Sequence, residues 1–408
     1  MNVQENAVRT PNLAPASKNL SSALIIAVLP LWSDRGDAIH TREIATSLED
    51  QGIATHIICL PGPDASPAEK SLSKVEVRPW MRRGLFQLSW NVFATVAALR
   101  TVRRESVDVI YSRLDPGMIV GWLVKALTGK PLIVEMNGLP TEDMRLFRPN
   151  AKFQIAVTRL WEKFMYKSAD RIVGAPGYIN YVKEVFHVAS EKCRTVQLGV
   201  NTDLFRPNDK GTARHMLKLP SRPTVVWMGN MTLWQGLETL IKSMAHVVHH
   251  VPDVRLIVVG SGVLFDECNA LSRSLDLSEH VVFVGHVPYA RVPVYLQAAD
   301  VCVSSFPGSR GIKGSISALK TVSYLAVGRP VVTTWMDELA DAITAQGAGY
   351  GVPPDDPAAM ADRIVMLLSE PEEVAKRRNS AALSLVSAGR SWVETAGVIA
   401  QSMEEVTK

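Results

Sequence analysis

The segment from Gly308 to Thr334 combines a glycine-rich basic loop with an apolar-periodic stretch and a short β-branched run. Its first three glycines, at 308, 311 and 314, would let a backbone approach a phosphate group closely. Gly314 and Ser315 are expected to form the turn and cap of a helix, whose outward N–H groups and positive dipole end attract an anion. By itself, an ordinary helix that leads into a strand is the simpler explanation. The alternative is a seat for a phosphate or diphosphate, formed by Gly314, Ser315, Ile316, Ser317 and Leu319.

Three cations accompany this segment. Arg310 and Lys313 stand in the loop before the expected helix, and Lys320 stands within it. Positive side chains at such a place would attract the negative charge of a phosphate or diphosphate. A solvated basic loop is the competing interpretation for each cation alone.

Strands and helices alternate along most of the chain. Apolar runs without polar alternation, such as LIIAVLP at 24–30, are typical of strands that are buried on both faces of a parallel sheet. Each following helix is the crossover that parallel neighbours require. The sequence therefore predicts an α/β fold with two doubly wound, Rossmann-like domains. A ligand is expected in the cleft between them, at the carboxyl ends of the strands.

The alternation lapses at residues 206–223, which are charged and bounded by prolines. We interpret this segment as a linker. It separates a first domain at 23–205 from a second domain at 224–388. Residues 1–22 are polar, contain two prolines and lack the apolar core of a signal peptide, so they predict a disordered tail.

Composition limits the class of protein. The chain has 408 residues, of which 47% are hydrophobic and 21% charged, as in a soluble globular protein. Four cysteines without a CxxC pair indicate reduced thiols in a cytosolic protein. No uncharged apolar run approaches the ~20 residues that cross a bilayer. The histidines at 246, 249 and 250 lack a second cluster with ligand spacing, which argues against a metal site.

Positive charge is concentrated in the first half. Residues 1–205 hold 25 Lys and Arg against 20 Asp and Glu, a surplus of five, whereas the remainder holds 19 against 20. Residues 78–104 contain six arginines, no acid and four large aromatic residues. Such a segment suits the surface of an anionic membrane, but a helix with a packed aromatic side and wet arginines fits equally well. Nucleic acid explains the surplus poorly, because no base-reading motif is present.

Ordered motifs in both halves resemble the retaining GT-B glycosyltransferases of glycosyltransferase family 4. The second half carries WMGNMTLWQGLETLI, RLIVVGSG and SALKTVSYLAVGRPVV, and the first half carries GDAIHTREIATSLEDQG and VQLGVNTDLFRP. The resemblance covers about residues 22–400 in the family's order and spacing. It implies an acceptor-side N-terminal domain, a nucleotide-sugar-binding C-terminal domain, and a final helix at 389–408 that crosses back to the N-terminal domain. The retained glycine loops imply donor contacts at Gly36, Asp37, Gly229 and Gly260.

At several positions where the family has polar site residues, this chain has different ones, although the motifs of the fold are retained. Members stabilise the leaving diphosphate with an arginine and a lysine; the matching residues here are Asn230 and Gln235, whose neutral hydrogen bonds are weaker. Two glutamates eight residues apart, which contact the donor sugar and ribose, are replaced by Ser315 and Ser323. Where the family often has a histidine after the fourth strand, this chain has Asn137, which we assign to the catalytic site.

We expect a retaining hexosyltransferase in which other cations replace the lost pair: the resemblance assigns Arg310 and Lys313 to catalysis, at the leaving diphosphate, and Lys320 to donor binding. The donor would be a nucleoside diphosphate sugar of the UDP or GDP type, without a cofactor or metal. The acceptor would be a glycan or lipid-linked glycan for surface polysaccharide or glycolipid, with a soluble small molecule as the alternative. The location would be cytoplasmic, at the inner face of the membrane through residues 78–104. The competing function is a degenerate homologue that acts as a partner or regulatory subunit. An epimerase or a phosphorylase matches less well, because the second half differs from the epimerase and no cofactor lysine is recognisable.

Overall fold

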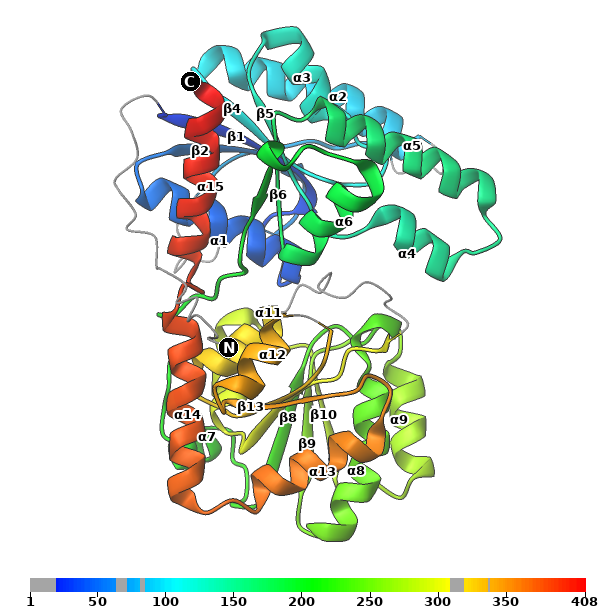
Figure 1. Cartoon of the computed structure of the whole chain (residues 1–408), viewed down its shortest axis with the longest axis vertical. Coiled ribbons are helices and arrows are strands. Elements are labelled where there is room, and N and C mark those ends of the chain that lie inside the picture. Colours follow the sequence, from blue (N-terminus) through cyan, green and yellow to red (C-terminus); the bar gives the residue numbers. More distant parts are fainter. Residues whose placement is uncertain (1–19, 64–71, 81–84, 309–318, 337) are drawn as a thin grey trace, which may run out of the picture. The chain divides into compact units, whose positions relative to one another are not determined.

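The computed structural model describes residues 20–63, 72–80, 85–308, 319–336 and 338–408. The chain divides into two compact units (Figure 1). The N-terminal unit runs to Gln197 and also contains Trp392–Lys408, and the C-terminal unit is Leu198–Ser391. Each unit contains its own parallel sheet.

The N-terminal unit is built on a seven-stranded sheet in the order β3-β2-β1-β4-β5-β6-β7. Every neighbouring pair is parallel. The strands are β1 (Ser22–Pro30), β2 (Ala54–Leu60), β3 (Ser73–Glu76), β4 (Val109–Arg113), β5 (Leu132–Glu135), β6 (Arg171–Gly174) and β7 (Cys193–Thr195). The helices are α1 (Gly36–Asp50), α2 (Phe86–Arg104), α3 (Val120–Thr128), α4 (Pro140–Phe147), α5 (Lys152–Ser168), α6 (Pro176–Phe186) and α15 (Trp392–Thr407).

The C-terminal unit repeats the same winding in a six-stranded parallel sheet, in the order β10-β9-β8-β11-β12-β13. The strands are β8 (Thr224–Met228), β9 (Arg255–Val259), β10 (Val281–Gly285), β11 (Val301–Ser304), β12 (Val331–Thr334) and β13 (Gly349–Val352). The helices are α7 (Lys210–Met216), α8 (Leu237–His250), α9 (Phe265–Ser274), α10 (Val292–Gln297), α11 (Leu319–Ala326), α12 (Glu338–Ala345), α13 (Pro357–Leu368) and α14 (Glu372–Ser387).

Both sheets reverse their strand order at one point, between β1 and β4 and between β8 and β11. Loops at the carboxyl ends diverge at such a point and leave room for a ligand. Strands β4, β5, β9 and β11 are buried along their whole length, which explains their unbroken apolar runs. The predicted fold of two doubly wound Rossmann-like units is confirmed.

The last helix belongs to the unit in which the chain begins. Helix α15 packs against α1, and Thr395 donates a hydrogen bond to the Gln197 carbonyl. The carboxylate of Glu405 accepts ion-pair contacts from Arg171 and Arg194 at 2.8 and 2.7 Å. The C-terminus is therefore part of the packed structure of the N-terminal unit.

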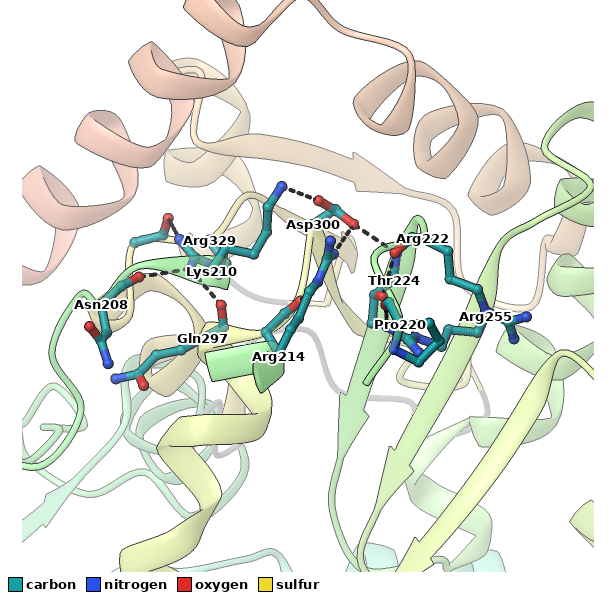
Figure 2. A network of polar contacts seen from close by, with 12 residues as sticks. Asn208, Lys210, Arg214, Pro220, Arg222, Thr224, Arg255, Gln297, Asp300 and Arg329 are labelled. Carbon is teal, nitrogen blue, oxygen red and sulfur yellow. Dashed lines mark hydrogen bonds and ion pairs between the residues drawn. The ribbon is translucent and has the colours of Figure 1, made fainter. Parts of the chain in front are cut away.

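Residues 206–223, interpreted above as a linker, lie within the C-terminal unit and contain α7. Figure 2 shows the polar network that fastens this segment to the amino ends of the strands. Asp300, which directly precedes β11, pairs with Arg214 at 2.6 Å and with Lys210, and it accepts the backbone N–H of Thr224 at 2.7 Å. The prolines and charges of this segment predicted a linker, but Lys210 and Arg214 pair with Asp300 directly before β11.

The same network continues on both sides of Asp300. Arg329, between α11 and β12, donates to the carbonyls of Gln297 at 2.6 Å and Asn208 at 3.1 Å (Figure 2). Arg255, at the start of β9, donates to the Pro220 carbonyl at 2.6 Å. Buried guanidinium groups thus satisfy the free carbonyls of the loops at this edge of the sheet.

We expect Asp300→Asn to lower the free energy of unfolding of the C-terminal unit by about 2–4 kcal/mol, because it leaves the Arg214 guanidinium without its anion in a mostly buried place. Urea unfolding measures the change. The matched control is Glu372→Gln, whose carboxylate pairs with Lys376 but is 82% exposed, so the change should stay within about 0.5 kcal/mol. Equal stability of the two variants would contradict a fastening role for Asp300.

Candidate functional site

The donor-side residues predicted from the sequence gather at the carboxyl ends of the C-terminal strands. Gly229 and Asn230 follow β8, Gln235 ends the short 3-10 turn Leu233–Gln235, and Gly260 follows β9. Leu319, Lys320 and Ser323 lie in α11, after β11. Other predicted residues lie outside the described part of the chain: Arg310, Lys313, Gly314, Ser315, Ile316 and Ser317.

Backbones approach one another very closely at this edge. Gly260 has φ +131°, and a Cβ there would lie 1.9 Å from the Gly229 carbonyl oxygen. Gly236 has φ +64°, and a Cβ there would lie 1.4 Å from the carbonyl oxygen of Ser305. Only glycine fits at either position. The loops that follow β8, β9 and β11 are therefore packed backbone against backbone.

Lys320 is a charged group at this edge of the sheet. Its side chain is buried, and its ammonium donates to Oε1 of Gln235 at 2.8 Å. The same ammonium lies 4.7 Å from the ring centroid of Trp227 and 4.4 Å from that of Phe306. Aromatic faces attract cations, and the attraction is stronger away from water. Lys320 is thus held beside Gln235 by an amide and two rings.

Two neighbouring residues of α11 have structural contacts. Ser323 is buried, and its hydroxyl donates to the Leu319 carbonyl at 2.9 Å, inside the helix. The Tyr324 hydroxyl accepts the backbone N–H of Met228 at 2.8 Å, so α11 is tied to the end of β8. Burial raises the pKa of Tyr324 well above its ordinary value, and the hydroxyl stays protonated.

In the N-terminal unit, the predicted residues Gly36 and Asp37 are the first two residues of α1. The carboxylate of Asp37 pairs with the exposed guanidinium of Arg35 at 2.7 Å. It also accepts the backbone N–H of Ala38 at 3.0 Å. An acid in the first turn suits the positive end of the helix dipole.

Three residues that the sequence analysis did not group form a buried polar cluster beside this helix start. His40 of α1 lies 2.5 Å from one carboxylate oxygen of Glu135, and Arg113 lies 3.5 Å from the other. Arg113 and Glu135 are the last residues of β4 and β5 and stand opposite each other in the register. His40 also packs edge-on against Trp392 of α15, with ring centroids 5.2 Å apart.

The cluster controls the ionisation of Glu135. Burial alone would raise the pKa of this carboxyl group, but the charge and hydrogen bond of His40, together with Arg113, outweigh burial and lower the pKa. Glu135 is therefore a fixed anion at the end of β5. Asn137, two residues further on, donates to the Glu135 carbonyl at 3.3 Å, so the cluster also fixes the strand end that carries Asn137.

Within the part of the chain that the structure describes, no group of three or more histidine, cysteine or acidic side chains is placed to hold a metal ion. Two sheets of Rossmann order, with glycine loops at the carboxyl ends of the strands, agree with the GT-B glycosyltransferase class that the sequence predicts.

Sequence comparison agrees with this class. The model of Glycosyltransferase Family 4 matches residues 35–204, and that of Glycosyl transferases group 1 matches residues 222–370. D-inositol 3-phosphate glycosyltransferase 1 of Catenulispora acidiphila is 30% identical over 306 residues, 70% of this chain and 69% of that protein. D-inositol 3-phosphate glycosyltransferase 2 of the same organism is 26% identical over 399 residues, 91% of this chain and 92% of that protein.

A solved structure shares the fold. Anabaena Alr3699/HepE in complex with UDP and glucose aligns with a TM-score of 0.72 and 16% identity, over 94% of this chain and 99% of that one. The chain belongs to glycosyltransferase family 4, and the predicted family is confirmed.

We expect Glu135→Gln to lower the free energy of unfolding of the N-terminal unit by about 2–4 kcal/mol near pH 7, because His40 and Arg113 lose their shared anion. The folded-state pKa of Glu135 lies below its ordinary value. Its contribution is therefore present above the ordinary pKa and is lost as the pH falls through the folded-state pKa.

Urea titrations near neutral pH and at pH values below the ordinary glutamate pKa of 4.5 test this expectation, and the gap between wild type and variant should shrink at the lower pH. Glu184→Gln, an exposed acid on α6, is the control and should leave stability unchanged. A gap that is constant with pH would show that Glu135 acts through packing and not through charge.

Proposed function

We propose that this family 4 glycosyltransferase moves a hexose from a nucleoside diphosphate sugar, of the UDP or GDP type, to an acceptor hydroxyl with retention at the anomeric carbon. The Anabaena protein of the same fold was solved with UDP and glucose, which supports a nucleotide sugar as donor. The Catenulispora relatives are named as D-inositol 3-phosphate glycosyltransferases, which supports a hydroxyl acceptor.

The observation that carries the proposal is the place of the Lys320 ammonium. The family resemblance puts a lysine at position 235, where this chain has glutamine. The Lys320 ammonium lies 2.8 Å from the oxygen of that glutamine, so a cation is present within one hydrogen bond of the family's position. We propose that Lys320 stabilises the leaving diphosphate and that Gln235 positions Lys320.

The remaining predicted residues keep supporting roles in this proposal. Arg310 and Lys313 would supply further positive charge from the loop before α11, and Asn137 would face the reacting sugar. Residues proposed to contact the donor are Gly36, Asp37, Gly229, Asn230, Gly260, Gly314, Ser315, Ile316, Ser317, Leu319 and Ser323. Asn230 is exposed, so its amide is accessible to a ligand.

For the acceptor we propose a lipid-linked or membrane-proximal glycan, used in surface polysaccharide or glycolipid assembly. The support is the basic and aromatic segment at 78–104. In the structure this segment is divided: Trp90 of α2 is fully buried, whereas Trp80 is 58% exposed and stacks edge-on with Phe93. Some of the aromatic residues of this segment are therefore packed in the core, whereas others lie on the surface.

Donor binding tests the role of Lys320. Wild type should show a rise in melting temperature with UDP or GDP, and Lys320→Gln should weaken that nucleotide's affinity by about tenfold or more, because a charge-assisted contact is lost. The double variant Gln235→Lys with Lys320→Gln should recover part of the affinity by returning the cation to the family's position. Lys242→Gln, an exposed lysine on α8, is the control.

A Lys320→Gln variant that binds the nucleotide like wild type would refute the role of this residue. The pair Arg310→Ala and Lys313→Ala then tests the loop cations by the same measurement. Absence of a shift in wild type with every nucleotide and nucleotide sugar would favour a homologue without transfer activity.

A further inference from the structure

Helix α5 presents large apolar side chains to solvent. Phe153 is 81% exposed, Val157 50%, Leu160 69% and Phe164 39%. Their spacing of four, three and four residues places them on one face of the helix. An exposed apolar stripe of this length on a globular protein indicates a contact surface.

The opposite side of α5 is firmly packed. Glu162, Met165 and Tyr166 are buried, and Thr141 of α4 and Tyr166 both donate to the Glu162 carboxylate. The indole of Trp161 donates to the Met118 carbonyl at 3.2 Å. The helix is thus held with its acid inward and its apolar stripe outward, the reverse of an ordinary amphipathic surface helix.

The stripe continues over neighbouring helices of the same unit. Trp122 of α3 packs edge-on against Phe164, with ring centroids 5.1 Å apart, and α3 packs against α2. Figure 1 shows α2, α3 and α5 following one another on one side of the N-terminal unit. Further exposed apolar residues are Leu127 of α3 and, spaced by four on α2, Leu88, Val92 and Val96. We call the outward sides of α2, α3 and α5 the basic apolar face.

The exposed charged residues of these helices are positive. Helix α5 adds the exposed residues Lys152, Arg159, Lys163 and Lys167, and α2 adds the exposed residues Arg100, Arg103 and Arg104. The only acid within these three fully described helices is Glu162, which is buried. The lysine of α3, Lys125, is neutralised by Asp170 at 2.7 Å.

The exposed apolar side chains and the positive charge of the basic apolar face favour some binding partners over others. A second copy docked through the same face would bring seven cations against seven cations, which is unfavourable. An anionic bilayer satisfies both features, because the apolar side chains enter the headgroup boundary while the cations are attracted to the anionic headgroups. Among the helices that the structure describes, none has the length and apolarity to cross a bilayer, so contact would be with one leaflet.

We propose that the basic apolar face docks on an anionic lipid surface, with α5 as its main element. The proposal deepens the proposed function, since docking would bring the N-terminal unit to a lipid-linked acceptor. It does not depend on transfer activity, because docking requires only this face. The sequence analysis assigned membrane contact to residues 78–104 alone; the exposed side chains add α5 and α3.

Vesicle co-sedimentation of the full chain tests the proposal, with phosphatidylcholine vesicles and with vesicles of phosphatidylcholine and phosphatidylglycerol. Wild type should bind the anionic vesicles more tightly. Phe153→Ser with Leu160→Ser should weaken binding about tenfold or more, because two exposed apolar side chains no longer enter the bilayer. Lys152→Gln, Lys163→Gln and Lys167→Gln together should weaken binding to anionic vesicles about tenfold or more and leave weak neutral binding unchanged.

Met216→Ser is the matched control, because Met216 is 53% exposed on α7 of the other unit. The melting temperature without ligand is measured on every variant, and it should stay close to that of wild type, which shows that the variants are folded. Wild type that fails to sediment, or apolar variants that sediment like wild type, would overturn the docking proposal and leave the transferase proposal untouched. Self-association of wild type that the apolar substitutions abolish, without lipid binding, would also overturn it.

Discussion

A buried charge is costly unless several polar groups surround it, and both units of this chain place such charges at the ends of sheet strands. Glu135 in the N-terminal unit is shared by His40 and Arg113. Asp300 in the C-terminal unit is shared by two cations and a backbone N–H. Lys320 is held by an amide oxygen and two aromatic faces. The two carboxylates fasten segments of the scaffold, whereas the ammonium stands at the edge where a Rossmann-type sheet receives its ligand.

The position of Lys320 is the basis of the proposal that a changed family site still holds a cation beside the leaving diphosphate. Gln235 is fixed by the turn that precedes α8, and Gly236 permits that turn only because it has no side chain. The ammonium of Lys320, which starts from α11, lies beside this glutamine and near the rings of Trp227 and Phe306. In the proposed function, two residues 85 positions apart thus take the role of the family's single lysine. The electrostatic requirement of a leaving diphosphate constrains where the charge lies and not which element supplies it.

The fold could be predicted from the sequence because each buried strand gives a continuous apolar run, and because parallel neighbours require crossover helices. Which side chains pack against one another could not be predicted in this way. His40, Arg113 and Glu135 are brought together by the register of β4 with β5, although a charged residue at the end of two neighbouring strands was an available signal. Helix α5 has apolar residues on both sides, so its pattern does not reveal that the acid Glu162 faces inward. The segment 206–223 has the composition of a linker, and only its partners Asp300, Gln297 and Arg329 show that it is packed.

The return of α15 to the N-terminal unit has a consequence for biosynthesis. Domains that are continuous in sequence can close as soon as they leave the ribosome. Here α1 and His40 are covered by Trp392 and the rest of α15, which are made after the whole C-terminal unit. The C-terminal unit, continuous in sequence from Leu198 to Ser391, is therefore complete before the N-terminal unit is. Nascent chains expose the uncovered side of α1 until α15 has been made, and a premature stop before Trp392 would leave that side permanently open to chaperones and proteases.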